Sequence, residues 1–160
     1  MANTNAKKKT KAECQVETMK HIDRVRHYIR IITDRLTTRG VEHDQTKLES
    51  PEVEYFTDAA NIENLTYGSE EYQASLDNLK VALDHHYAQY RHHPEHFQNG
   101  IKDMNLVDLV EFLCDIKAAS ERQHDGNLLK SIDTCADRFN ICGQLKQILV
   151  NTAKMLDEQK

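Results

Sequence analysis

Two residues with metal-binding side chains, His43 and Asp44, stand side by side in the chain. Residues of the same two types are found before and after this pair, at His21, His86, His92, His93 and Asp115. Imidazole and carboxylate groups together are ligands for divalent ions such as Zn²⁺, Mn²⁺ or Fe²⁺. A bound ion lowers the pKa of water, so that a nucleophile exists near neutral pH. If the fold gathers these side chains around a shared ion, the sequence predicts a metal-dependent hydrolase.

The composition favours long helices as the elements that hold these side chains. The 160 residues include only five Gly and two Pro, and no segment shows the alternation that is typical of a strand. A chain of this length most often forms one domain with a sizeable core. We therefore predict an all-α fold, a single compact domain of about five to seven helices over residues 13–160. The polar, lysine-rich segment 1–12 is predicted to be a disordered tail.

Apolar residues that recur every three or four positions, together with caps and breaks, place the helices. The predicted segments are a long helix over 14–39 ended by Gly40, one or two short helices over 44–60 broken near Ser50-Pro51, a helix from Ser69 to about Tyr90, one over 105–123, and a final helix over 128–156. Asn105 is expected to cap the helix that follows it. A polar loop over 61–68, a break at Pro94 and a turn at 125–127 connect these segments.

Helical periodicity also separates inward-facing histidines from outward-facing ones. At about 100° per residue, His21 lies near the apolar face of its helix and His27 lies almost opposite. By the same geometry, His86 shares the apolar stripe of its helix, whereas His85 faces away. An inward histidine needs a polar partner. Asp115 lies on a helix that is apolar on both flanks, and a cation would balance a carboxylate buried there.

Charge and cysteine usage limit the classes of function. The net charge of -5 gives no general attraction to phosphate backbones, so we expect no binding to duplex nucleic acid. No apolar run reaches the ~18 residues of a membrane span, and the N-terminus lacks the apolar stretch of a secretory signal. The four cysteines show no C-x-x-C spacing and fit a reducing compartment. We therefore expect a cytoplasmic protein that does not enter a membrane.

The ordered set His21, His43-Asp44 and Asp115 resembles the motif of the HD-domain superfamily of metal-dependent phosphohydrolases. Lys47, three positions after Asp44, matches the H-D-x-x-K form of the HD-GYP phosphodiesterases. Two further segments look like theirs: His92-His93-Pro94-Glu95 through Gly100, and Asp115 followed by Ala118-Ala119 and Arg122. The G-Y-P triplet is missing, so specificity for cyclic dinucleotides is not implied. Lys47 also replaces the acid of the H-D-x-x-E deoxynucleotidases.

The span from about His21 to Leu149 also resembles an uncharacterised family of small bacterial and phage proteins. In chain order, the shared pattern is a histidine, the motif HD-x-x-K, a second histidine, the motif HHPE after five or six further residues, and an aspartate. This likeness carries no activity with it. It implies a location in the bacterial cytoplasm or in a phage-infected host cell.

The HD resemblance implies roles for the matched residues. His21, His43, Asp44 and Asp115 would hold a first metal ion. Asp44 would bridge to a second ion, held by His86 and by His92 or His93. Lys47 would neutralise charge on phosphoryl oxygens in the transition state, and Glu111 could orient a ligand. One or two divalent ions are expected, and the residue types admit Mn, Fe, Zn, Co or Ni.

Three functions are compatible with this set of residues. The leading hypothesis is a phosphohydrolase that uses metal-activated water, with Asp44 and Lys47 as catalytic residues and a nucleotide or related phosphate ester as small-molecule substrate. The second keeps the histidine-rich centre but makes it a di-iron oxygenase of the HD fold. The third is a non-catalytic helical module that binds a nucleotide or a partner protein. The apolar final helix offers a face for a homodimer.

Overall fold

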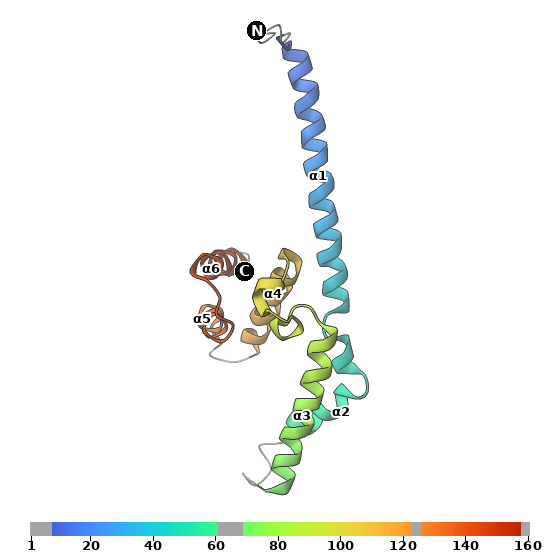
Figure 1. Ribbon diagram of the computed structural model, residues 1–160, viewed down its shortest axis with the longest axis vertical. Helices are drawn as coiled ribbons and strands as arrows, with labels where there is room; N and C mark the ends of the chain where they lie inside the picture. The colour runs from blue at the N-terminus through green and yellow to red at the C-terminus, as the bar shows by residue number, and fades with distance from the viewer. Residues whose placement is uncertain (1–7, 61–68, 123–125, 158–160) are drawn as a thin grey trace, which may run out of the picture. The chain divides into compact units, whose positions relative to one another are not determined.

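The computed structural model describes residues 8–60, 69–122 and 126–157 (Figure 1). Over these residues the chain forms six α-helices and three short 3₁₀ turns, and no strand is present in the described ranges. The prediction of an all-α chain with five to seven helices is confirmed for this part of the chain. The predicted loop over 61–68 and most of the predicted tail lie outside the described residues. By its internal contacts the chain divides into two units, Met1–Thr38 and Arg39–Lys160.

The first unit is described by one helix. Helix α1, Lys11–Glu42, begins in this unit and has 32 residues, none of them buried. Its apolar side chains recur at the spacing seen in the sequence, and they are exposed, as at Ile22, Val25 and Ile29. Helix α1 begins at Lys11, so it includes the last two residues of the segment predicted as a tail. None of the described helices combines the length and apolarity needed to cross a lipid bilayer.

The prediction that Gly40 ends the first helix is wrong. Helix α1 continues through Gly40 to Glu42, and the left-handed residue that turns the chain is Asp44, with φ 56°. A glycine inside a helix costs roughly 0.5–1 kcal/mol relative to alanine, which weakens a helix without ending it. Aspartate tolerates the left-handed region better than most side chains because its short polar group can bond locally. The helix therefore ends at the HD pair itself.

Two short elements and one longer helix follow this turn. The 3₁₀ turn η1, Gln45–Leu48, and helix α2, Glu52–Ala60, confirm the predicted break near Ser50-Pro51. Helix α3, Glu70–Gln89, packs against α2 and agrees with the predicted helix from Ser69 to about Tyr90. The 3₁₀ turns η3, Pro94–His96, and η4, Gly100–Asp103, then lead to the last three helices.

Helix α4, Leu106–Glu121, begins as predicted with Asn105 as its cap. The Asn105 side chain accepts from the amides of Val107 and Asp108, and the Asp108 carboxylate accepts from the Asn105 amide. This reciprocal arrangement satisfies amides that the first helical turn would leave unpaired. It also fixes the rotation of α4, and with it the direction in which the acids of that helix point.

The predicted final helix over 128–156 is wrong in one respect, because it is two helices. Helix α5, Leu128–Arg138, and helix α6, Gly143–Asp157, are separated by a turn in which Asn140 has φ 50°. Asparagine is tolerated in this left-handed region, which reverses the chain. The two helices pack on each other and on α4 around one apolar core. That core consists of Phe112, Leu113, Leu128, Ile132, Ala136, Ile141, Leu149 and Ala153.

Helix α4 is buried on two sides of different character. Phe112 and Leu113 face the apolar core, whereas Asp108 and Glu111 are buried polar residues. Asp108 is fully buried and is held by Arg39 from α1 and by Arg91 from the segment after α3. These two arginines tie the end of α1 and the end of α3 to α4. The three segments thus meet at the carboxylate side of α4.

Candidate metal centre

The side chains of the candidate site come from the segments that meet at α4. His43 and Asp44 lie at the turn after α1, and His86 lies in the last turns of α3. His92 and His93 lie between α3 and η3, and Asp115 projects from α4. Six of the seven residues predicted as metal ligands are therefore brought together in the second unit. Two overlapping groups of them have the spacing of a metal site, and a third such group joins His43 and His92 to Glu111.

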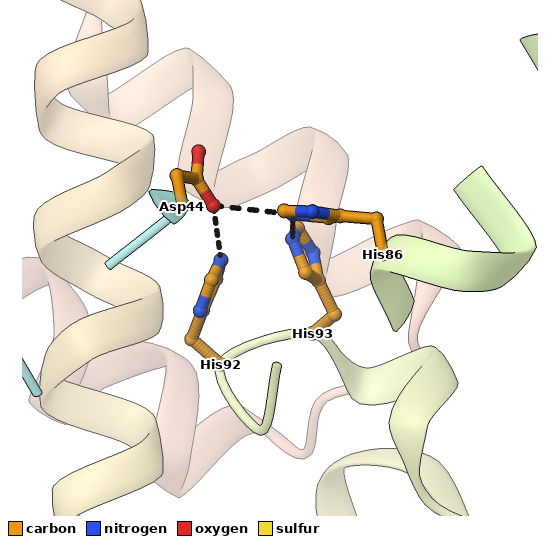
Figure 2. A group of neighbouring side chains, drawn as sticks. All are labelled: Asp44, His86, His92 and His93. Atoms are coloured by element: carbon orange, nitrogen blue, oxygen red, sulfur yellow. Dashed lines mark hydrogen bonds and ion pairs between the residues drawn. The ribbon is translucent and has the colours of Figure 1, made fainter. Parts of the chain in front are cut away.

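Two imidazole rings, His86 and His92, approach one oxygen of Asp44, and a third, His93, approaches His86 (Figure 2). Nε2 of His86 lies 3.1 Å from Asp44 Oδ1, and Nε2 of His92 lies 3.5 Å from the same oxygen. Nε2 of His93 lies 3.0 Å from Nε2 of His86. One donor atom from each of these four residues lies within 4.8 Å of the others. Two ligand atoms on a tetrahedral ion with bonds of about 2.0–2.1 Å are roughly 3.3 Å apart, so these separations suit one ion.

A second group uses the other oxygen of Asp44. Nε2 of His43 lies 3.7 Å from Asp44 Oδ2 and 3.7 Å from Asp115 Oδ1. His43, Asp44 and Asp115 form a separate set with metal-site spacing. Asp44 thus belongs to both groups, with Oδ1 toward His86 and His92 and Oδ2 toward His43. A carboxylate in this position could join two neighbouring ions.

The carboxylate of Glu111 holds two of the rings from behind. Its Oε1 accepts a hydrogen bond from His43 Nδ1 at 3.0 Å and lies 3.1 Å from His92 Nδ1. Its Oε2 forms an ion pair with Arg39 at 2.5 Å. An ionised carboxylate is only an acceptor, so it favours a proton on each Nδ1. Nε2 of each ring is then the atom that faces Asp44, as a metal ligand requires.

The hydrogen bonding of two buried atoms indicates whether a metal ion fits the site. His92 Nε2 and Asp44 Oδ1 are buried, and among the described residues neither forms a hydrogen bond of acceptable geometry, although Asp44 Oδ1 lies 3.1 Å from His86 Nε2; the same is true of His92 Nδ1, 3.1 Å from Glu111. Leaving a buried polar atom unpaired costs on the order of 1–3 kcal/mol. Both atoms carry lone pairs, and a cation between them would satisfy both. The donor set of imidazole nitrogen and carboxylate oxygen suits Zn, Mn, Fe, Co or Ni.

The charges of the site hold its acids in the ionised form. Burial raises the pKa of Asp44, but His86, Lys47 and His43 outweigh this effect and the net pKa is lowered. Burial likewise raises the pKa of Glu111, and His43 and His92 lower it to about 2. For Asp115, His43 outweighs burial in the same way and the pKa is lowered. All three carboxylates are therefore anionic at neutral pH and ready to face a cation.

The histidines differ from one another in charge. Asp115 and the hydrogen bond to Glu111 raise the pKa of His43 to about 10, against the opposing effect of burial. His43 is therefore a cation before an ion binds, and its Nε2 proton must leave when the ion arrives. Burial, with the neighbouring His92 and His86, lowers the pKa of His93 to about 3. The neutral ring of His93 keeps a lone pair for a metal.

Lys47 lies at the edge of the site. Its Nζ donates to Asp44 Oδ2 at 2.6 Å, and its ammonium group lies 5.5 Å from the centre of the Phe56 ring. About a third of the Lys47 side chain is exposed to solvent, 36%. The lysine is thus close enough to belong to the site, and its side chain is exposed enough to contact a molecule from solution. It also neutralises part of the charge of Asp44.

His21 is the one predicted ligand that the structure does not bring into these groups. It lies on α1 in the first unit and is exposed, although its helical position predicted an inward direction. His27 is exposed as expected. The role of His21 as a ligand stays a prediction from the resemblance.

Sequence reasoning missed Glu52 and misjudged His85. Glu52 is the first residue of α2 and is fully buried, with its carboxylate on His85, His86 and Thr46. Burial raises the pKa of Glu52, and these three hydrogen bonds outweigh it, so the net pKa is lowered. His85, expected to face away, is half-buried against Glu52. An acid in the first turn of a helix is common on protein surfaces, so nothing in the sequence indicates this contact.

Comparison with known proteins gives a family without an assigned activity. No curated protein and no solved structure matches the chain. Residues 10–158 match the family of unknown function DUF5662, and this span includes α1 and every residue of the candidate metal centre. Since the match covers nearly the whole chain, the protein belongs to the DUF5662 family.

Proposed function

We propose that this protein is a metal-dependent phosphohydrolase that acts on a nucleotide or a related phosphate ester. The observation that carries the proposal is the convergence of His43, His86, His92 and His93 on Asp44, with Asp115 beside His43. The buried lone-pair atoms His92 Nε2 and Asp44 Oδ1, which lack a hydrogen bond of acceptable geometry, support the binding of a cation between them. The resemblance of the same residues to the HD motif supports phosphate-ester hydrolysis.

The residues fall into two sets of ligands around the shared Asp44. His86, His92 and His93 with Asp44 would hold one ion, and His43 and Asp115 with Asp44 would hold the other. A divalent ion bound there would supply a Lewis acid and a water of lowered pKa. Glu111 keeps the rings of His43 and His92 in the orientation that presents Nε2. Asp44 is the residue on which both sets depend.

The exposure of the side chains indicates where a phosphate group would enter. His86 and His92 are buried, whereas the side chains of His43, Asp44 and Asp115 are 27%, 23% and 29% exposed. Lys47 lies beside Asp44 on the more open side of the group. A phosphoryl oxygen that approaches there would meet the Lys47 ammonium group, whose charge would stabilise the anionic transition state. This arrangement supports Lys47 as a catalytic residue.

The histidine-rich group around His86, His92 and His93 keeps a second candidate open, a di-iron oxygenase. Three imidazoles and one carboxylate are a plausible ligand set for iron. The two candidates share their ligands and differ in metal and in substrate. Metal analysis with oxygen uptake separates them, since two irons per chain and oxygen consumption would favour the oxygenase.

The test of the proposal is phosphate release by the purified protein loaded separately with Mn²⁺, Co²⁺, Zn²⁺, Fe²⁺ or Ni²⁺. The panel should contain phosphomonoesters, phosphodiesters and nucleoside triphosphates. Asp44→Asn is the sharpest variant, because asparagine accepts the left-handed backbone of this position while it removes the charge. His27→Ala, an exposed histidine outside the group, is the matched control. A metal-loaded protein that is inert across the panel, or activity that survives in Asp44→Asn, contradicts the proposal.

A further inference from the structure

Glu52 is a fully buried acid in contact with a histidine of the candidate metal centre, and it is not itself one of the proposed ligands. Its side chain is 0% exposed, at the beginning of α2. Oε2 lies 2.9 Å from His86 Nδ1, and Oε1 lies 2.7 Å from His85 Nδ1. Oε1 also accepts from the Thr46 hydroxyl at 2.8 Å. The carboxylate thus has partners on both of its oxygens and is held from two elements, α3 and η1.

The contact with His86 determines which nitrogen of that ring carries the proton. An ionised carboxylate accepts hydrogen bonds and donates none, so Nδ1 of His86 must be the N–H. The alternative tautomer would place two lone pairs against each other at 2.9 Å. The carboxylate of Asp44 faces Nε2 at 3.1 Å in the same way, and a cation between Nε2 and Asp44 removes that conflict, so the Nδ1–H tautomer belongs to the metal-bound centre. With the proton on Nδ1, a neutral His86 presents the lone pair of Nε2. That atom is the one that lies 3.1 Å from Asp44 and 3.0 Å from His93.

The contacts with His85 and Thr46 explain why Glu52 cannot turn away from His86. Both partners bind Oε1, which leaves Oε2 directed at His86. His85 is adjacent to His86 on α3, and its side chain is 40% exposed. Carboxylates behind a metal-bound histidine fix the orientation and tautomer of the ring in many metal sites.

We infer that Glu52 is a positioning residue of the metal centre, which fixes His86 as the Nδ1–H tautomer and directs the Nε2 lone pair at the ion, with His85 as its anchor. This inference rests on the metal binding in the proposed function, but not on the reaction that the centre catalyses. It adds to the centre a residue that matches no part of the HD motif. Glu52 acts through His86 and does not itself touch the ion or a substrate.

The first experiment determines the tautomer of His86 in the wild-type protein. Long-range ¹H–¹⁵N NMR spectra of the ¹⁵N-histidine-labelled, Zn²⁺-loaded protein distinguish the two tautomers of each ring, and a His86→Gln spectrum assigns the signals of His86. We expect the proton of His86 on Nδ1, with Nε2 bound to Zn²⁺. A proton on Nε2 instead would overturn the inference. Because no substrate is present, this result is independent of whether the protein hydrolyses phosphate esters.

The second experiment measures Zn²⁺ affinity by competition with a chromophoric chelator. Glu52→Gln keeps the shape of the side chain but places an amide against one of the two histidines, and we expect Zn²⁺ affinity to fall about 10- to 100-fold. Glu54→Gln, an exposed acid on the same helix, is the matched control and should bind as the wild type does. His85→Asn should cause a smaller loss than Glu52→Gln.

The outcomes separate the inference from the proposed function. Wild-type Zn²⁺ affinity in Glu52→Gln would overturn the positioning role, even if the protein hydrolyses a phosphate ester. A strong loss of Zn²⁺ affinity with an inert wild type would support the positioning role and contradict the phosphohydrolase. Circular dichroism shows whether the Glu52→Gln protein is folded. If it is not folded, the NMR measurement of the His86 tautomer in the wild-type protein decides whether the positioning role holds.

Discussion

His43 and Glu111 are separated by 68 positions in the sequence, yet Nδ1 of His43 lies 3.0 Å from Oε1 of Glu111. This contact joins the turn after α1 to the middle of α4. Glu111 also lies 3.1 Å from His92 Nδ1 and pairs with Arg39 through its other oxygen. One carboxylate therefore connects three segments that are far apart in the chain. The geometry of the candidate centre depends on this carboxylate as much as on the ligands.

Replacement of Glu111 by Ala should weaken both stability and metal binding. Arg39 would lose one of its two acidic partners, and His43 would lose its Nδ1 acceptor. We expect a loss of about 1–3 kcal/mol in the free energy of unfolding, measured by urea denaturation of the metal-free protein. Metal affinity should fall about 10- to 100-fold. Glu49→Ala, an exposed acid, serves as control. Unchanged metal affinity in Glu111→Ala would show that the ring orientations do not depend on this contact.

Metal stoichiometry should distinguish the two groups of ligands. Asp44 belongs to both groups, His93 to one of them and Asp115 to the other. If the wild type binds two ions per chain, Asp44→Asn should lose both, whereas His93→Ala and Asp115→Asn should each lose one. Elemental analysis of the purified variants measures this directly. Full metal content in Asp44→Asn would refute the shared role of this residue.

His21 is predicted to be a ligand from the resemblance, although it is exposed on α1. If this prediction holds, His21→Ala should lower metal affinity by an amount comparable to Asp115→Asn. His27→Ala, a change of the same kind on the same helix, should leave affinity unchanged. Isothermal titration with Zn²⁺ measures the three variants side by side. Wild-type affinity in His21→Ala would leave His43, Asp44 and Asp115 without the fourth residue that the HD motif implies.

Asp108 should make the stability of the protein depend on acid pH. Burial raises its pKa, but Arg91, the Asn105 amide and Arg39 outweigh burial, and the net pKa is lowered. A carboxyl group with a lowered folded pKa contributes its full stability above its unfolded pKa of about 3.9. That contribution is lost as the pH falls through the still lower folded value. The buried carboxylate therefore stabilises the fold at neutral pH.

Asp108→Asn tests this dependence. Its free energy of unfolding should be lower than that of the wild type by about 1–3 kcal/mol at neutral pH. The difference should shrink as the pH is lowered below about 4, because the wild-type carboxyl group then becomes protonated. Urea denaturation of both proteins in the presence of a chelator gives the comparison. A difference that stays constant down to the lowest pH would show that Asp108 does not act through its charge.

The sequence predicts the helices better than it predicts where they end. Asn105 predicts the start of α4 correctly, because a capping residue acts on the backbone of the helical turn next to it. His86 follows from helical periodicity, and it is 1% exposed. Asn140, in contrast, interrupts a helix whose apolar pattern continues on both sides of it, so periodicity alone joined α5 to α6. Such an ending depends on the packing of the two helices against α4, which lies far away in the sequence.

In the candidate site, too, some features can be predicted from the local sequence and others depend on tertiary packing. His43, Asp44, His86, His92, His93 and Asp115 stand out by residue type and order, and the structure brings them within reach of one another. Glu111 is also predicted as a residue that could orient a ligand, whereas Glu52 could not be recognised in the same way. Glutamate is common in helices, and only the fold brings Glu52 against His86. The candidate ligands can thus be found from residue type and order, whereas the contact of Glu52 with His86 depends on tertiary structure.

Gly40 offers a direct test of how α1 ends. The structure places it inside the helix, and a Cβ atom added there would meet no atom within 4 Å. Gly40→Ala should therefore stabilise the protein by about 0.5–1 kcal/mol, since alanine loses less backbone entropy than glycine in a helix. If Gly40 instead took the left-handed conformation that ends many helices, alanine would destabilise the protein by a similar amount. Thermal unfolding of the metal-free variant measures the sign. A lower Tm would indicate that Gly40 has a left-handed backbone and that α1 ends there, before the turn that carries His43 and Asp44.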